Sequence, residues 1–277
     1  RILIIGLGLL GGSYARALTK RGYDVYAITK EQSSVDYAVA NGIVAKATTA
    51  VDHEMIYNAD LVIFALYPKV FVEWIRENQE HFRPGTVITD VTGVKCSVVY
   101  KIQSMLRSDV EFISAHPMAG RESSGIENSD DSVFLNANYI VVPTDKNTQS
   151  AIELCESLGY ELGFRRISIL SPEKHDEMIA FLSQLTHCIA VSLMCSNGDE
   201  HLYEYTGDSF RDLTRIAKIN EKMWSELFIL NKDKLLASLD MFLAETKKLR
   251  GYISDEDVAG IEKMMITSTE RRKKFDK

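Results

Sequence analysis

His116 is the side chain best suited to act as a general base in this chain of 277 residues. It follows an apolar segment, 110–115, that we interpret as a strand, and it precedes Pro117 and a loop that contains glycine. An imidazole with an ordinary pKa of about 6.5 can accept a proton at neutral pH. A histidine here can also serve as a capping or core residue, so position alone leaves both interpretations open.

A glycine pattern at the start of the chain indicates a bound phosphate group. Gly6, Gly8 and Gly11 directly follow the apolar segment 2–5 and overlap the start of a predicted helix, 9–20. Gly6 would permit a tight turn, Gly8 would let a pyrophosphate approach the backbone, and Gly11 would let the helix pack closely on the strand. The positive end of the helix would face the phosphate charge. We interpret the pattern as a dinucleotide site, with a purely structural turn as the alternative.

The residues after the second predicted strand, 24–28, bear on the type of dinucleotide. An NAD site usually has an acidic residue there, which accepts hydrogen bonds from the ribose. This chain has Thr29 and Lys30, which would accommodate the 2′-phosphate of NADP, while Glu31 is close enough in sequence to reach back. The expected cofactor is therefore NAD or NADP. The expected cofactor-binding residues are Gly6, Gly8, Leu9, Leu10, Gly11, Thr29, Lys30 and Leu66.

Further candidates for chemistry lie in the second half of the chain. His175 and His187 are twelve positions apart on one predicted helix, and we expect both to face the same way. Arg215 lies in an apolar helical pattern and needs an anion, either an acid such as Asp212 or Glu122 or the carboxylate of a ligand. We expect no metal site, because no cysteine or third histidine stands at ligand spacing.

The elements that would position these residues divide the chain into two parts. Apolar strands alternate with helices up to residue 170, which predicts a parallel sheet with helices on both faces. From residue 171 the periodicity is helical only. The predicted fold is an α/β Rossmann-type doubly wound sheet domain, 1–170, followed by an all-α dimerisation domain, 171–277. After the first two strands, further strands are expected at 61–65, 86–90, 110–115, 139–142 and 161–167, and helices at 34–41, 68–81, 96–106 and 149–158.

The composition narrows the possible partners. A net charge of -7 gives no reason to expect nucleic acid. We found no apolar stretch of about 18 residues and no signal peptide, so we expect no membrane span and a cytoplasmic location. The four cysteines show no CxxC spacing, which favours reduced thiols. The second domain could hardly bury its apolar faces alone, so we expect a homodimer.

Several segments follow one another along the chain: the glycine pattern, 90–95 (DVTGVK), 116–125 (HPMAGRESSG), His175-Asp176 with Ser183 and His187, and 210–217 (FRDLTRIA) with Trp224. Taken in this order, they resemble the prephenate/arogenate dehydrogenase family of tyrosine biosynthesis. The resemblance implies an oxidative decarboxylation of prephenate to 4-hydroxyphenylpyruvate, in a two-domain form without an added mutase or regulatory domain. Arogenate dehydrogenase, or a cyclohexadienyl dehydrogenase of dual specificity, is the alternative, and a nucleotide-binding regulator without activity is a more remote one.

The resemblance also implies roles for individual residues. His116 would accept the proton of the substrate hydroxyl, and Arg215 would bind the ring carboxylate. His187 and Ser183 would line the pocket, and Glu122 would belong to a charged network near Arg215. Trp224 would lie close to the pocket, contributed by the same chain or by the partner subunit.

One position departs from the family pattern. Gly93 stands where the family usually has a serine that supports the catalytic histidine. We expect Thr92, one residue earlier, to supply the missing hydroxyl and count it with His116 as a catalytic candidate; a water molecule is the alternative.

Overall fold

The computed structural model describes residues 1–120 and 123–275. Within it the chain forms two compact units, Arg1–Asn231 and Lys232–Lys277, which are considered separately below.

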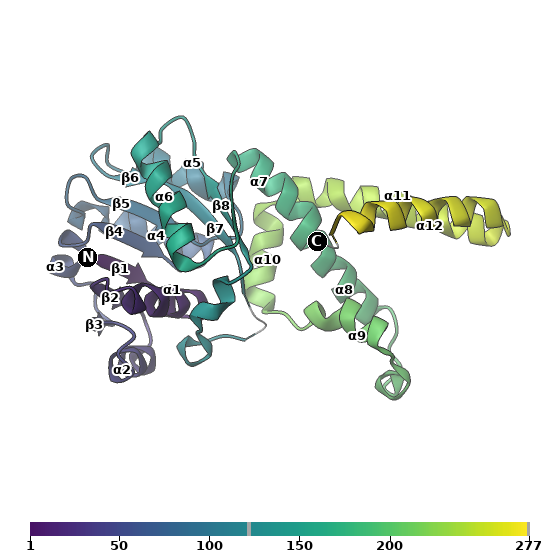
Figure 1. Cartoon of the computed structure of the whole chain (residues 1–277), viewed down its shortest axis with the longest axis horizontal. Helices are drawn as coiled ribbons and strands as arrows, with labels where there is room; N and C mark the ends of the chain where they lie inside the picture. Colours follow the sequence, from purple (N-terminus) through teal and green to yellow (C-terminus); the bar gives the residue numbers. More distant parts are fainter. Residues whose placement is uncertain (121–122, 276–277) are drawn as a thin grey trace. The chain divides into compact units, whose positions relative to one another are not determined.

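The first unit is built on a parallel sheet of six strands in the order β3-β2-β1-β4-β5-β6. This is the strand order of dinucleotide-binding folds, with the change of direction between β1 and β4. The strands lie side by side in Figure 1. Their bounds are β1 Ile2–Ile5, β2 Val25–Ile28, β3 Lys46–Thr48, β4 Leu61–Phe64, β5 Val87–Asp90 and β6 Glu111–Phe112.

Helices cover both faces of this sheet. In β1, Ile2 and Ile4 belong to one buried apolar cluster while Leu3 and Ile5 belong to another, so alternate side chains enter two separate cores. A strand buried on both faces must be apolar at every position, which explains the uninterrupted aliphatic segment. The connecting helices are α1 Leu9–Lys20, α2 Gln32–Ala40, α3 His53–Tyr57, α4 Pro68–Asn78 and α5 Cys96–Met105.

A second sheet holds the candidate base, and here the sequence-based expectation was wrong. The segment predicted as one strand, 110–115, divides at Ile113 into β6 of the first sheet and β7 of the second. His116 therefore lies inside a strand, paired with Ile140, rather than beyond a strand end. Ile113 is fully buried and apolar, so the residue at the division carries no turn signal in the sequence. The second sheet has the order β7-β8-β9, with β7 (Ser114–Met118) antiparallel to β8 (Asn138–Val142) and β8 parallel to β9 (Arg166–Ile169).

The strand predicted at 161–167 was also placed too early. Helix α6, Gln149–Leu162, continues through its first residues and ends at Gly163, whose φ of +90° suits a glycine C-cap. The short elements β3 and α3 were missed, because three to five residues give too little periodicity to detect.

After β9 the chain is helical. Ser171 caps the next helix by accepting a hydrogen bond from the Lys174 amide, with Pro172 in the first turn. The helix contains a π-helical turn and is followed by shorter helices, of which α9 and η6 pack against α8. The bounds are α7 Pro172–Ile179, the π turn η4 Ala180–Gln184, α8 Leu185–Cys195, η5 Leu202–Tyr205, α9 Asp208–Thr214, η6 Arg215–Ala217 and α10 Glu221–Leu230.

The continuous helix from Pro172 to Cys195 is long and apolar enough to cross a membrane by length and composition. The expectation that no such segment exists was therefore wrong on this count. Its buried polar side chains, His175, Asp176 and Gln184, form hydrogen bonds with other parts of the unit. Only 28% of the most apolar part of the helix is buried, and a single helix of this length and composition is weak evidence for a membrane span.

The second unit is a pair of helices, α11 Lys232–Ser254 and α12 Val258–Arg272, with the short turn η7 Lys273–Phe275 at its end. Asp257 caps α12 through the Gly260 amide. Both helices expose large apolar side chains: Leu236, Met241, Leu243, Ile253, Met265 and Ile266.

Candidate active site

The glycine turn has the geometry that a dinucleotide pyrophosphate requires. Gly6 has a φ of +98°, and a Cβ there would lie 2.5 Å from the carbonyl oxygen of Ala65. A Cβ at Gly11 would collide with the carbonyl oxygen of Gly6, so helix and turn are in direct contact. Gly8, the N-cap of α1, faces open space, since a Cβ there would meet nothing within 4 Å. The turn therefore leaves its backbone open to a phosphate at the N-terminus of a helix of 12 residues.

The end of β2 brings a carboxylate toward this turn. The Thr29 hydroxyl accepts a hydrogen bond from the Leu7 amide at 3.4 Å and donates one to the Glu31 carboxylate at 3.3 Å. Thr29 is buried, so it braces the turn, while Lys30 and Glu31 are exposed. Leu66, after β4, lies against Gly6, as the sequence predicted for residues that follow neighbouring strands.

A buried ion pair fixes the segment between β5 and α5. Lys95 and Asp90 are both fully buried, with 2.9 Å between Nζ and Oδ2. Nζ also donates to the carbonyl oxygen of Ala115 at 2.6 Å, and Asp90 Oδ1 accepts from the Ser114 hydroxyl at 2.5 Å. Burial lowers the pKa of Lys95, and the nearby Asp90 carboxylate opposes that shift. The pair joins β5 to β7 next to His116.

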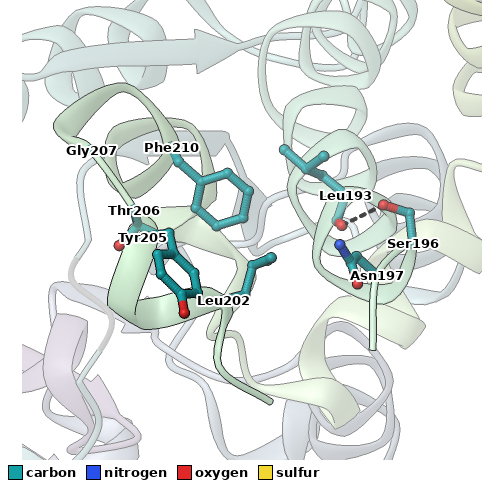
Figure 2. A pocket seen from close by; sticks show the side chains of 8 residues that line it. All are labelled: Leu193, Ser196, Asn197, Leu202, Tyr205, Thr206, Gly207 and Phe210. Atoms are coloured by element: carbon teal, nitrogen blue, oxygen red, sulfur yellow. Dashed lines mark hydrogen bonds between the residues drawn. The ribbon is translucent and has the colours of Figure 1, made fainter. Parts of the chain in front are cut away.

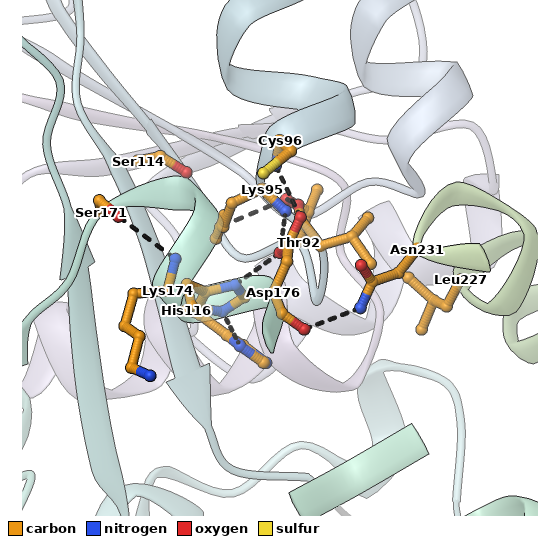
Figure 3. Close-up of polar contacts among 12 residues, drawn as sticks. Thr92, Lys95, Cys96, Ser114, His116, Ser171, Lys174, Asp176, Leu227 and Asn231 are labelled. Carbon is orange, nitrogen blue, oxygen red and sulfur yellow. Dashed lines mark hydrogen bonds and ion pairs between the residues drawn. The ribbon is translucent and has the colours of Figure 1, made fainter. Parts of the chain in front are cut away.

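His116 is the first member of a chain of three side chains. Its Nδ1 lies 2.8 Å from Nε2 of His175, and Nδ1 of His175 lies 2.8 Å from Oδ1 of Asp176. The carboxylate in turn accepts hydrogen bonds from the Lys95 and Cys96 amides at the start of α5, each at 2.8 Å. Figure 3 shows these groups converging from β7, α7 and the segment before α5.

The surroundings keep both histidines neutral. Burial holds the pKa of His116 well below its ordinary value, and the positive charge of Lys95 acts in the same direction. Burial also lowers the pKa of His175, although its hydrogen bond to Asp176 opposes this. For Asp176, burial raises the pKa, but hydrogen bonds from His175 and from the Cys96 and Lys95 amides outweigh it and lower the pKa. A neutral His116 can accept a proton.

Gly93 lies beside Nε2 of His116, the ring nitrogen that does not face His175. A Cβ at this position would be 3.9 Å from Nε2 of His116 and 3.6 Å from Leu227 of α10. The Thr92 hydroxyl, by contrast, donates toward Asp90 and Val94 and accepts from Lys95. Within 1–120 and 123–275 it makes no hydrogen bond to His116, so the structure corrects the expectation that Thr92 replaces the serine as the partner of the histidine.

His187, Ser183 and Trp224 lie together on α8, η4 and α10. The His187 ring stacks on Trp224 of the same chain, with 3.7 Å between ring centroids. Nδ1 of His187 lies 2.8 Å from the carbonyl oxygen of Ser183. Leu227, one turn after Trp224, faces Gly93 and accepts through its carbonyl oxygen from the Gln184 amide at 3.0 Å. These contacts connect the aromatic stack to the neighbourhood of His116.

The structure describes one of the two charged residues predicted near the substrate anion, Arg215, and does not describe the other. Arg215 is exposed and begins η6, which packs on α8, the helix that carries His187. Glu122 lies outside the described residues.

A separate hollow of about 360 Å³ lies at the far end of α8. Figure 2 shows its lining, which includes the aromatic rings of Tyr205 from η5 and Phe210 from α9. It contains none of the predicted site residues; it is lined by Leu193, Ser196, Asn197, Leu202, Tyr205, Thr206, Gly207 and Phe210.

Comparison with known protein families shows which family has this combination of domains. The model for the nucleotide-binding domain of prephenate dehydrogenase matches residues 14–168, and the model for its dimerization domain matches residues 171–267. The chain belongs to the prephenate dehydrogenase family. The fold class and the family inferred from the sequence are thus confirmed.

Individual relatives agree with this. The chain is 30% identical to prephenate dehydrogenase of Bacillus subtilis, over 98% of this chain and 75% of the relative. It is 31% identical to cyclohexadienyl dehydrogenase of Zymomonas mobilis, over 92% and 89%. The crystal structure of prephenate dehydrogenase from A. aeolicus, solved with hydroxyphenyl propionate and NAD+, superposes with a TM-score of 0.92 at 27% identity, over 99% of this chain and 98% of the other.

Sequence reasoning missed two parts of the site. The Asp90–Lys95 pair was noted only as part of a motif, and His175-Asp176 was not connected to His116. The buried cation in an otherwise apolar stretch was a usable signal, because a buried lysine requires a partner.

Proposed function

We propose that this protein is an NAD-dependent prephenate dehydrogenase. The observation that carries the proposal is the neutral His116, whose Nε2 lies beside Gly93 in a chain with an open dinucleotide-binding turn. Membership of the family supports the same reaction. The division into a nucleotide-binding domain, 1–170, and a substrate-binding and dimerisation domain, 171–277, belongs to this proposal.

The chemistry follows from the substrate. Prephenate is a cyclohexadienol with a ring carboxylate and a pyruvyl side chain. Its hydroxyl proton passes to Nε2 of His116 while hydride leaves the ring carbon that bears the hydroxyl. NAD⁺ held at the glycine turn would supply the acceptor for that hydride. The ring carboxylate then leaves as CO2, its bonding electrons complete the aromatic ring, and the oxygen regains a proton.

Binding of a doubly charged anion to a chain of net charge -7 requires local cations. Arg215 is our candidate for the ring carboxylate, because a guanidinium matches a carboxylate with two parallel hydrogen bonds. His187, held by Trp224 and by the Ser183 carbonyl, is our candidate for contact with the side chain of the substrate. Glu122 stays a prediction.

The contacts at the end of β2 support NAD over NADP. The hydrogen bond from Thr29 holds the Glu31 carboxylate at this end, where it can accept from a ribose hydroxyl and would repel a 2′-phosphate. Glu31→Ser should therefore reduce the preference for NAD, whereas Lys30→Ala should leave the preference for NAD intact. A preference that does not change in Glu31→Ser would contradict this assignment.

A homodimer and a cytoplasmic location complete the proposal. The exposed apolar side chains of α11 and α12 suit a partner subunit, and the matched family domain is a dimerization domain. Sedimentation analysis should give twice the mass of the chain. The buried Cys155 is a thiol, as is usual in reducing compartments.

One experiment tests the function directly. Purified protein is incubated with prephenate or arogenate and with NAD or NADP, and the absorbance of reduced nicotinamide and the release of CO2 are followed. We expect the fastest reaction with prephenate and NAD, with one CO2 released per hydride transferred. A faster reaction with arogenate would establish the alternative substrate, which the resemblance to the Zymomonas enzyme keeps in view. No reduction in any combination, with cofactor binding intact, would refute the dehydrogenase assignment.

A further inference from the structure

The hydrogen bonds behind His116 determine which of its two nitrogens carries the proton. This series of hydrogen bonds starts at the main-chain amides of Lys95 and Cys96. An amide N–H can only donate, and both donate to Asp176. Asp176 has a lowered pKa and is ionised at neutral pH, so it can only accept. Nδ1 of His175 must therefore donate to it.

The remaining assignments follow from neutrality. A neutral imidazole with a proton on Nδ1 has an unprotonated Nε2, so Nε2 of His175 is an acceptor. His116 Nδ1, 2.8 Å away, must be the donor of that bond. The proton of neutral His116 is then on Nδ1, and Nε2 carries the lone pair, beside Gly93.

We infer that His175 and Asp176 are positioning residues that hold His116 in the tautomer whose Nε2 can accept the proton of a substrate hydroxyl. The identity of that hydroxyl rests on the proposed function, whereas the tautomer rests on the hydrogen bonds alone. Within the described residues the two ring nitrogens of His175 bond to His116 and Asp176, so His175 acts on the reaction through His116.

The hydrogen-bonded series His116–His175–Asp176 also stabilises the positive charge that forms on His116 during the reaction. When Nε2 of His116 takes up the proton, Nδ1–H remains donated to His175, and the positive charge is backed by the Asp176 carboxylate. Among residues 1–120 and 123–275, the other charged groups facing this pair are Lys95 and Asp90, which neutralise one another at 2.9 Å. The net charge behind the base is therefore that of Asp176, which favours the protonated form of His116 as it develops.

Solution NMR tests the tautomer without any assay of activity. The protein is labelled with ¹⁵N at its six histidines, and His116 is assigned by the signal lost in His116→Gln. At neutral pH we expect Nδ1 of His116 to be protonated and Nε2 to be unprotonated. The opposite tautomer, or a doubly protonated ring, would overturn the inference. Because this measurement uses the unmodified protein, it does not depend on whether variants of a buried residue fold.

A matched pair of substitutions tests the positioning role. In His175→Gln the amide can accept from His116 with its oxygen and donate to Asp176 with its nitrogen, so the tautomer is kept. In His175→Leu the acceptor is removed. We expect kcat to fall by about 10²-fold in His175→Leu and by less than about tenfold in His175→Gln. KM for prephenate and the affinity for NADH should stay within about threefold in both.

The pH profile separates positioning from general damage. Loss of the acceptor removes stabilisation of protonated His116, so the acid limb of kcat/KM should move to lower pH in His175→Leu and stay in place in His175→Gln. Equal losses in the two variants, or a limb that does not move in His175→Leu, would overturn the inference. Absence of turnover in the unsubstituted protein would refute the proposed function instead, and the NMR result would still decide the tautomer.

Discussion

Replacing Lys95 by methionine should destabilise the protein far more than replacing an exposed lysine whose ion pair has a similar length. Methionine fills a similar volume but leaves the Asp90 carboxylate fully buried without a cation. Removal of one partner from a buried ion pair costs about 3–5 kcal/mol, because the remaining charge stays desolvated. Asp90 keeps neutral donors, among them the Ser114 hydroxyl at 2.5 Å and the Ala115 amide at 3.2 Å, so we expect the lower end, about 3 kcal/mol.

Thermal unfolding at a fixed scan rate measures this loss. For a protein of this size about 3 kcal/mol corresponds to a decrease in Tm of roughly 6–12 °C. Lys174→Met is the matched control: its ion pair with Glu177 is also short, at 3.0 Å, but both side chains are at least half exposed. Such a pair contributes about 0–1 kcal/mol.

A second substitution identifies the cause of the loss. In Asp90→Asn combined with Lys95→Met neither member of the pair is charged, so the double variant should be more stable than Lys95→Met by at least about 1 kcal/mol. If Lys95→Met lowers Tm no more than Lys174→Met does, or if the double variant is as unstable as the single one, the reasoning about the buried pair is refuted.

Three further predictions concern the site. His116→Asn should lower kcat by about 10²–10⁴-fold with NADH binding unchanged, and retained turnover would contradict the mechanism. Because the pKa of His116 is depressed, the unsubstituted enzyme should lose activity only below the pH at which an ordinary histidine titrates. Arg215→Ala should raise KM by about tenfold or more, while Arg211→Ala, which removes an exposed pair with Asp208, should leave KM unchanged; equal effects would remove Arg215 from the substrate site. Gly93→Ser should exceed Gly93→Ala in kcat/KM by about fivefold, because a Cβ at this position makes only ordinary contacts and would place a serine hydroxyl near Nε2 of His116. Identical rates would show that this position needs no hydroxyl.

The parts of the fold that the sequence predicts well are those set by local chemistry. The helix predicted at 9–20 agrees with α1 at both ends, because a glycine turn starts it and Gly22, with φ of +85°, follows it. Strands buried on both faces, such as Leu61–Phe64, stand out as short aliphatic segments. The division at Ile113 could not be predicted, because membership of one sheet or another depends on distant partners and not on the segment itself.

The site residues that could be predicted are likewise those whose role depends on local sequence. The glycine turn and His116 were found because their chemistry is visible in single residues and their neighbours. The bond from His175 to His116 spans 59 positions, and the amides that orient Asp176 are main-chain groups, which leave no mark in a sequence. The hydroxyl of Thr92 was misassigned for the same reason, since its orientation toward Asp90 is fixed by the buried Lys95.

The π-helical turn η4 changes the angular phase of the helix that carries both His175 and His187. In a regular α-helix twelve residues rotate by about 1200°, which leaves the two side chains about 120° apart. A π turn takes up one extra residue without extra rotation, which reduces the difference to about 20°. The expectation that both histidines face the same way therefore depends on this turn. Deletion of one residue within 180–184 would restore the regular helix and rotate every residue after it by about 100° relative to His175.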